Sequence, residues 1–201
     1  AGLAVYLGFN LEHFAFGEGL GANLGPASPE PDVLNHAWRE YGNRVGAWRC
    51  LELFDQLGLP AAAIINTALY DHCPELVAAC VARGDELVAH GHTNAERQGG
   101  WDEASERERI QAQSAVSPQG WLSPWISESR LTPDLLAETG YRYTLNWCHD
   151  DQPLPMRTRS GQVLWSVPYP QELNDIPMII ARRMDGKAFA QMIIDNLDEM
   201  L

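Results

Sequence analysis

The segment His90-Gly91-His92 carries side chains well suited to chemistry near neutral pH. Histidine titrates in that range and is the commonest metal-binding side chain, so both imidazoles are candidate metal ligands or acid–base groups. A structural interpretation stays open, in which Gly91 forms a turn and the two rings bond to nearby backbone. Glu12 is the next candidate, because a carboxylate can accept a proton or bind a metal, although it can equally cap a loop.

Both candidates follow short apolar segments that are typical of buried strands. We predict strands at residues 3–10, 60–66, 86–90, 120–122, 142–146 and 163–167, with helices at 44–57, 75–83, 102–113, 132–139 and after Asp185. This alternation predicts an α/β fold of parallel strands joined by crossover helices, in one domain over residues 1–201. The pattern does not distinguish an open doubly wound sheet from a closed barrel.

Polar side chains recur just beyond these strands, at the end that carries the active site in parallel α/β folds. The predicted catalytic residues are Glu12, His90, Asp150 and Asn10. The predicted substrate contacts are Asn66, His92, Trp125, Asn146, Trp147, Asp151 and Tyr169. Alternatives stay open here as well, since two adjacent aspartates also suit a turn and tryptophans also pack in a core or at its rim.

The composition excludes several classes of protein. A net charge of −13 argues against nucleic acid or an anionic membrane as a partner, and no apolar run approaches the roughly 18 residues of a membrane span. The four cysteines lack CxxC spacing, which favours reduced thiols and a cytoplasmic location. Glycine-rich phosphate loops and the GxSxG and HExxH motifs are missing, which argues against dinucleotide binding, serine hydrolases and zincins.

Five segments, in this order, resemble the allantoinase-like branch of the polysaccharide deacetylases. They are Phe9-Asn10-Leu11-Glu12, the run from Gly42 to Arg49, the run from Glu86 to His92, the run from Asn146 to Pro153, and the run from Val167 to Asp175. The resemblance spans nearly the whole chain. It implies a distorted (β/α)7-type barrel and the hydrolysis of a non-peptide C–N bond.

The chain departs from the family pattern at the metal site that the resemblance implies. The family ends its first strand in two aspartates, where this chain has Asn10 and Glu12, and Asn94 stands in place of the second metal-binding histidine. The resemblance therefore leaves Glu12, His90 and Asn94 as metal ligands. A site with a divalent metal such as Zn²⁺ and a metal-free site both stay open, because asparagine is a weak, neutral ligand.

Two further departures concern missing residues. The family's arginine-bearing motif has its counterpart around Ser123-Pro124-Trp125, without the arginine. The family's late histidine would lie beyond Leu201, and the sequence ends in a predicted helix. We therefore expect the barrel to be incomplete at its C-terminus, and the abrupt connection near Ser114 also suggests missing chain.

We predict a hydrolase of amide C–N bonds whose substrate is a small amide or cyclic ureide rather than a polymeric sugar. Without a metal, Glu12 or Asp150 would accept the proton from water, and the Asn66 or Asn146 amide would stabilise the oxyanion. The alternatives are a deacetylase of N-acetylated sugars and a degenerate barrel that binds a small ligand or carbohydrate without turnover. The expected partner is the small-molecule amide or carbohydrate substrate, with no nucleic acid or membrane, and a homo-oligomer stays open.

Overall fold

The computed structural model describes residues 2–17, 24–26, 28–116 and 118–201. The chain forms two compact units, one of residues 6–168 and one of residues 1–5 with 169–201. All strands and every candidate site residue except Tyr169 belong to the larger unit. Among the described residues, no helix combines the length and apolar character that a bilayer span requires.

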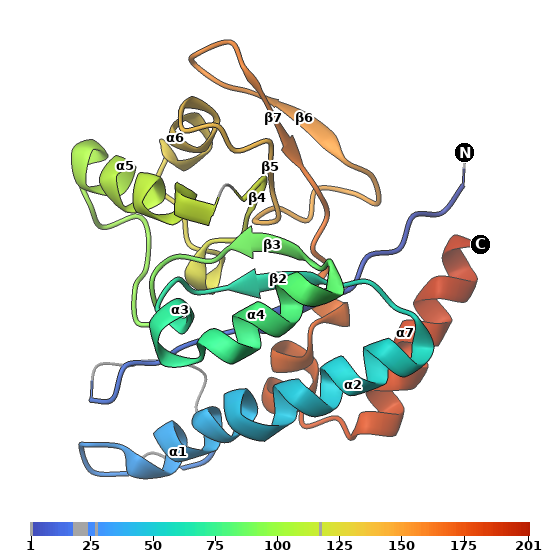
Figure 1. Cartoon of the computed structure of the whole chain (residues 1–201). Coiled ribbons are helices and arrows are strands. Elements are labelled where there is room, and N and C mark those ends of the chain that lie inside the picture. Colours follow the sequence, from blue (N-terminus) through green and yellow to red (C-terminus); the bar gives the residue numbers. More distant parts are fainter. Residues whose placement is uncertain (1, 18–23, 27, 117) are drawn as a thin grey trace. The chain divides into compact units, whose positions relative to one another are not determined.

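The larger unit is built on a seven-stranded sheet with the order β1-β2-β3-β4-β5-β7-β6 (Figure 1). The strands are β1 (Gly8–Leu11), β2 (Ala62–Ile65), β3 (Glu86–Ala89), β4 (Gly120–Trp121), β5 (Tyr143–Thr144), β6 (Leu154–Arg157) and β7 (Val163–Ser166). Every neighbouring pair is parallel except β6 and β7, which form an antiparallel hairpin. Within the described residues, no hydrogen-bonded ladder joins β1 to β6.

Helices cross over between the parallel strands. They are α1 (Val33–Tyr41), the π-helical turn η1 (Gly42–Gly46), α2 (Ala47–Leu57), α3 (Leu69–His72), α4 (Pro74–Arg83), α5 (Glu103–Ala112), η2 (Gln113–Val116), η3 (Pro124–Ile126) and α6 (Thr132–Glu138). Local sequence explains several boundaries. Pro74 opens α4, the Asp102 carboxylate caps α5, and Gly58 ends α2 in a left-handed conformation with φ 64°.

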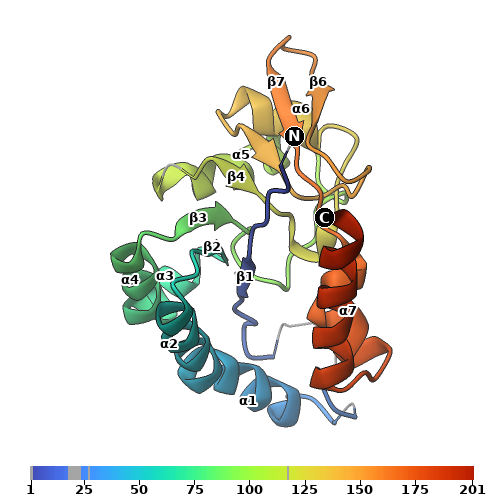
Figure 2. The ribbon, with the colours of Figure 1, turned by 90° about the vertical axis from the view of Figure 1, so that its right-hand side faces the viewer.

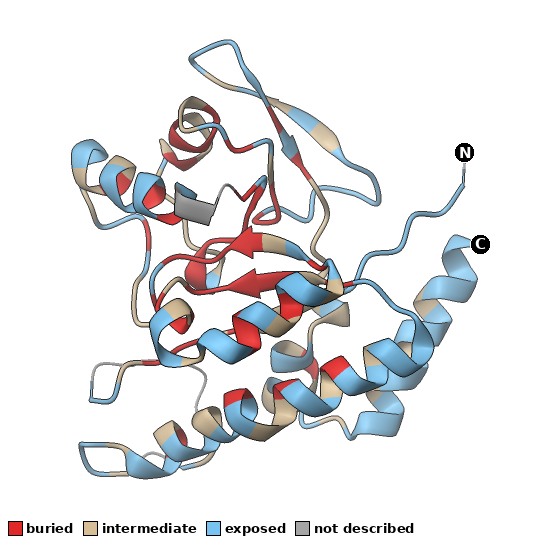
Figure 3. Cartoon of the chain, in the orientation of Figure 1, coloured by how far each residue is buried: buried red, intermediate tan, exposed pale blue. Residues whose placement is uncertain are grey.

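Two apolar clusters hold these helices on the sheet. The first joins buried side chains of α2, α3 and α4 to β1 and β2, with Leu51, Leu69 and Leu76 packed against Leu11 and Ile65. Figure 2 shows these helices on the outer side of the curved strands, and Figure 3 shows their buried faces turned toward the sheet. The second cluster packs α5 and α6 against β3, β4 and β7. Burial of apolar area therefore fixes each crossover on its strand.

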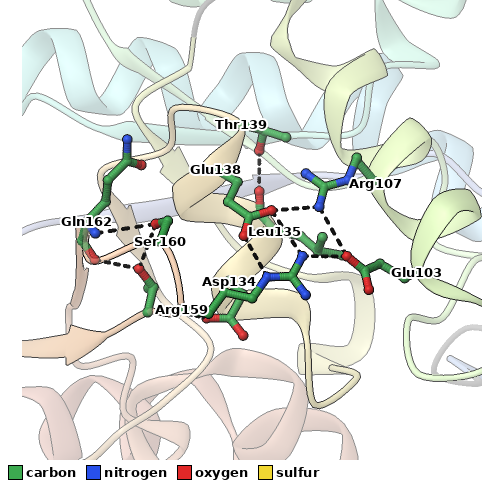
Figure 4. A network of polar contacts seen from close by, with 10 residues as sticks. Glu103, Arg107, Asp134, Leu135, Glu138, Thr139, Arg159, Ser160 and Gln162 are labelled. Atoms are coloured by element: carbon green, nitrogen blue, oxygen red, sulfur yellow. Dashed lines mark hydrogen bonds and ion pairs between the residues drawn. The ribbon is translucent and has the colours of Figure 1, made fainter.

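A surface network of ion pairs fastens the turn between β6 and β7 to α5 and α6 (Figure 4). Arg159 donates to Glu138 at 2.6 Å and also to Glu103, and Arg107 donates to the same two carboxylates at 2.6 and 3.2 Å. Hydrogen bonds from Arg159 and Arg107 lower the pKa of Glu138 to about 2. Exposed pairs of this kind contribute little individually, so the network fixes orientation more than it adds stability.

The smaller unit contains η4 (Gln171–Leu173), the π-helical η5 (Ile176–Ala181) and α7 (Gly186–Met200). Asp185 caps α7, since its carboxylate accepts the backbone N–H groups of Lys187 and Ala188 at 2.9 Å. The helix predicted after Asp185 is therefore present. η5 was not expected from the sequence.

The structure also corrects the predicted elements of the larger unit, where the short helix α3 is a further addition. β6 is a seventh strand that the sequence pattern missed, because Leu154–Arg157 includes a proline and polar residues and pairs only along the edge of β7. α1 was also missed, and it continues through η1 into α2. The first strand begins at Gly8 rather than residue 3, because its partner β2 offers ladder positions only from Ala62 onward.

Candidate functional site

The site is assembled where β1, β2 and β3 end at one level. The parallel register pairs Leu11 with Ile65 and Ile65 with Ala89. The next residue along each strand is Glu12, Asn66 or His90. Three candidates separated by up to 78 positions in sequence are thereby brought to the same sheet edge.

Glu12 and His90 form a dyad at the centre of this edge. His90 Nε2 lies 3.4 Å from Glu12 Oε1, and His90 Nδ1 lies 2.6 Å from the Leu122 carbonyl oxygen. Because a carbonyl only accepts, Nδ1 carries a proton and donates to Leu122. When the ring is charged, Nε2 donates to the Glu12 carboxylate, and when the ring is neutral, Nε2 turns a lone pair toward it. This arrangement holds a proton or a hydrogen-bond donor between the two groups.

The surroundings of Glu12 favour its ionised form. Its side chain is 27% exposed, and burial alone would raise its pKa. Hydrogen bonding to and charge attraction from His90, together with donation from Asn10 and Asn94, outweigh burial and hold the pKa below its usual value. Glu12 is therefore a carboxylate at neutral pH and a candidate base.

Asn66 joins the three loops that follow these strands. The side chain is fully buried, and its Oδ1 accepts the His13 backbone N–H at 2.8 Å. Its Nδ2 donates to the His90 carbonyl and, at 3.2 Å, to Asn94 Oδ1. Both N–H groups of this amide are used within the protein, so in this conformation neither is left for a substrate oxygen.

Asn43 supports Glu12 from a helix and was not among the predicted site residues. Its buried amide donates to the Glu12 backbone carbonyl at 2.9 Å from the π-helical turn η1. Single π turns are frequent at functional sites, because they re-aim a side chain within a helix. The residue lies in the segment from Gly42 to Arg49 that carries the family resemblance, which is the one signal that could have identified it.

The predicted metal ligands lie together, but they form a weak set. Asn94 Oδ1 accepts from Asn66, so the Asn94 side chain turns its NH₂ group, a donor, toward Glu12. Glu12 and His90 remain as two strong ligands, whereas Zn²⁺ sites use at least three protein ligands. Among the side chains that the structure describes, no group of three His, Cys, Asp or Glu residues converges as a metal site. The donor set of these residues therefore does not fit a Zn²⁺ site.

A second polar group lies at the ends of β4 and β5. Asn146 Oδ1 accepts from the Ser123 backbone at 2.8 Å, and its Nδ2 donates to Ser123 Oγ at 2.8 Å and to Glu128 Oε1 at 2.6 Å. Trp147 Nε1 also donates to Glu128, at 3.0 Å. Burial raises the pKa of Glu128, and the negative charge of Glu106 adds to this rise. The hydrogen bonds from Asn146 and Trp147 act in the opposite direction but do not cancel it. Sequence reasoning missed Glu128, because it follows no strand.

Other predicted contacts are placed less centrally. His92 is exposed, with Nδ1 3.1 Å from Thr67 Oγ1. Trp125 donates to the Asn94 carbonyl at 2.8 Å and stacks under Arg97. Asp150 and Asp151 lie in an exposed turn, where Asp150 Oδ1 accepts from a backbone N–H at 3.1 Å. Tyr169 belongs to the smaller unit and accepts from Asn174 at 3.0 Å.

Two segments with left-handed backbone pack against each other next to His90. Gly91 has φ 67°, and a Cβ at this position would lie 2.6 Å from Pro124 Cγ. Trp125 and Ile126, which follow Pro124, have φ 61° and 54°. Positive φ in such bulky residues is unusual and concentrates at functional sites. Only glycine fits between His90 and His92, which explains the His-Gly-His segment physically.

Comparison with known proteins supports the class that this fold indicates. A peptidoglycan deacetylase of Helicobacter pylori is 25% identical over 170 residues, which cover 80% of this chain and 58% of that protein. The chain thus spans less than two thirds of this curated relative. The Puue allantoinase structure matches with a TM-score of 0.81 and 23% identity, over 96% of this chain and 70% of that one.

A structure from Pseudomonas aeruginosa, described as a probable polysaccharide deacetylase, matches with a TM-score of 0.79 and 23% identity over 96% of this chain and 71% of that one. No family model matches the sequence. The chain has the fold of the polysaccharide deacetylase superfamily, and the predicted resemblance to that superfamily is confirmed. The predicted α/β fold of the (β/α)7 type is confirmed with it, with a hydrogen-bonded sheet that is not closed among the described strands.

Proposed function

We propose that the protein hydrolyses a non-peptide amide C–N bond, with Glu12 as general base and His90 as its partner. The observation that carries this proposal is the Glu12–His90 dyad, in which the Leu122 carbonyl fixes the proton on Nδ1 and turns Nε2 toward the carboxylate. The resemblance to deacetylases and an allantoinase supports the reaction class.

In the proposed reaction, a water molecule donates one hydrogen bond to Glu12 Oε1 and one to His90 Nε2. Its oxygen lone pairs then face the substrate carbonyl, and Glu12 accepts a proton as the C–O bond forms. The dyad returns a proton to the nitrogen of the leaving group when the C–N bond breaks. Asn10 and Asn94 hold the carboxylate in position through the hydrogen bonds that they donate to it.

The finer assignment is a small amide or cyclic ureide as substrate, in preference to a polymeric sugar. We assign positioning roles to Asn66 and Asn146, since their amide hydrogens are bonded within the protein. The proposed roles of Asp150 as a second proton acceptor and of His92, Trp125, Trp147, Asp151 and Tyr169 as substrate contacts depend on how the substrate lies.

The test is hydrolysis of a panel containing allantoin, hydantoin, N-acetylglucosamine and its oligomers. We expect turnover of at least one compound and a loss of at least about 100-fold in kcat/KM for Glu12→Gln and His90→Ala, the usual contribution of general acid–base catalysis. Glu75→Gln, on the exposed side of α4, is the matched control and should leave kcat/KM unchanged. No turnover across the panel, or full activity in Glu12→Gln, contradicts the proposal.

A further inference from the structure

A pocket of about 390 Å³ lies among the segments that follow β1, β2 and β3. Its lining consists of His13, Ala15, Ala68, His72, His92, Thr93, Ala95 and Glu96. His13 directly follows Glu12 in the chain, and Thr93 directly precedes Asn94, so the lining and the dyad belong to the same loops. The proposed proton transfers use none of these side chains, and only His92 among them is a proposed substrate contact.

Hydrogen bonds between the three loops fix the walls of the pocket. The Asn94 backbone donates to the His13 carbonyl at 3.0 Å, and the Ala68 backbone donates to the His92 carbonyl at 3.1 Å. The rings of His13 and His72 stack with centroids 4.0 Å apart and an interplanar angle of 12°. The pocket is therefore held by the same loop contacts as the dyad and has one flat, polar wall.

The imidazoles supply hydrogen-bond acceptors. His13 is buried, and its Nδ1 has no hydrogen-bond partner but lies 4.0 Å from Glu40 Oε1. The carboxylate favours the tautomer with hydrogen on Nδ1, which leaves Nε2 as an acceptor. The Thr67 hydroxyl binds one nitrogen of His92, and the other is available to a ligand.

The charges of the pocket disfavour an ionic ligand. Among the lining residues that the structure describes, none is Lys or Arg, and the one carboxylate, Glu96, already pairs with Arg109 at 2.7 Å. An anionic ligand would lie near the Glu96 carboxylate, and no Lys or Arg among the described lining residues would pair with it. A cationic ligand would have to compete with Arg109 for Glu96. A ligand charge removed from water without a partner is strongly disfavoured.

We propose that this pocket binds the non-reacting part of the substrate and accepts one uncharged ring whose edge carries N–H or O–H donors. The proposal rests on the proposed function for the position of the reacting bond. Three alanines and the flat imidazole pair suit a ring face, and the acceptors suit donors at its edge. The volume lies near the lower end for small-molecule sites, so it admits a single ring rather than a run of sugars.

Titration calorimetry with defined probes tests this assignment. Hydantoin and N-acetylglucosamine are the two uncharged probes, and comparing them distinguishes binding of a cyclic ureide from binding of a single sugar. Hydantoin acetic acid and N-acetylmuramic acid are their carboxylate-bearing counterparts, and chitotriose is the chain. We expect one neutral ring to bind at least about tenfold more tightly than its anionic counterpart, and chitotriose to bind no more than about threefold more tightly than the monosaccharide.

Substitutions locate the binding. Ala95→Leu fills the pocket from its wall and should weaken the neutral ring at least about tenfold, whereas Ala82→Leu, on an exposed position of α4, should change nothing. His72→Phe keeps a stacked ring without its nitrogen acceptors and should also weaken binding. The proposal is overturned if neither neutral ring binds, if Ala95→Leu binds as wild type does, or if the anions or chitotriose bind at least tenfold more tightly.

Measuring binding and hydrolysis separately distinguishes this inference from the proposed function. Glu12→Gln protein should still bind the neutral ring, because Glu12 is not part of the pocket lining, although it should not hydrolyse the substrate. Retained binding with no hydrolysis in wild type overturns the hydrolase proposal alone. Hydrolysis that Ala95→Leu leaves unchanged overturns the pocket assignment alone.

Discussion

Replacement of Asn66 by alanine removes the buried amide that joins the loops after β1, β2 and β3. The substitution leaves the His13 N–H, the His90 carbonyl and Asn94 Oδ1 without the partner that each has in the wild type. A buried polar group that loses its partner costs about 1–3 kcal/mol, and water can satisfy some of the three. We therefore expect the free energy of unfolding to fall by about 3 kcal/mol, or roughly 6–12 °C in Tm for a chain of this size.

The assay is thermal unfolding followed by circular dichroism, with kcat/KM measured on the same protein once a substrate is known. Gln56→Ala on α2 is the control, because Gln56 is exposed and makes one long contact to Glu52, at 3.4 Å. It should change the free energy of unfolding by less than about 0.5 kcal/mol. A fall in Tm of less than about 2 °C for Asn66→Ala would refute the reasoning that this amide holds the loops.

Asn66→Asp separates hydrogen bonding from side-chain volume. The carboxylate keeps an acceptor for the His13 N–H but turns a second oxygen toward the His90 carbonyl and Asn94 Oδ1. Acceptors that face one another repel, so this variant should be destabilised at pH 7 despite its unchanged size. Protonation lets the carboxyl donate, so the defect relative to wild type should shrink near pH 4. Equal stability of Asn66→Asp and wild type at pH 7 would contradict the assigned direction of these bonds.

Four further results are expected. Gly91→Ala should lower kcat/KM at least about tenfold, because the added Cβ would clash with Pro124 and because alanine is strained at the positive φ of this position; wild-type activity would disprove this. The kcat/KM of wild type should fall as the pH is lowered, since protonation of Glu12 or of His90 Nε2 removes an acceptor for the attacking water; a kcat/KM that stays constant down to pH 4 would contradict both assignments. Prolonged chelation should leave activity within about twofold of untreated enzyme, and a loss that Zn²⁺ restores would show that the weak ligand set binds a metal after all. Arg159→Ala should expose the turn between β6 and β7 to proteolysis, measured against Arg182→Ala in the smaller unit as control; equal cleavage rates would mean that the network does not hold the turn.

The sequence alone was sufficient to predict the class of fold and the grouping of Glu12, Asn66 and His90 at one edge of the sheet. Alternating strand and helix patterns predict parallel strands, and parallel strands bring their carboxyl ends to one edge. Glu12, Asn66 and His90 could therefore be grouped from the sequence, because each directly follows an apolar strand. The family resemblance added the reaction class, which periodicity does not contain.

Tertiary structure decided which hydrogen-bond partners each of these groups has. The direction of the Asn94 amide depends on Asn66, and the tautomer of His90 depends on the Leu122 carbonyl, 32 positions away. Asn43 and Glu128 were missed because neither follows a strand, and only packing brings them to Glu12 and Asn146. Local sequence determines which residues directly follow the carboxyl end of each strand, because this depends only on where the strand lies in the chain and on the chain direction. Hydrogen-bond partners and burial are set by segments distant in sequence, and these determine whether a polar side chain binds, positions or donates.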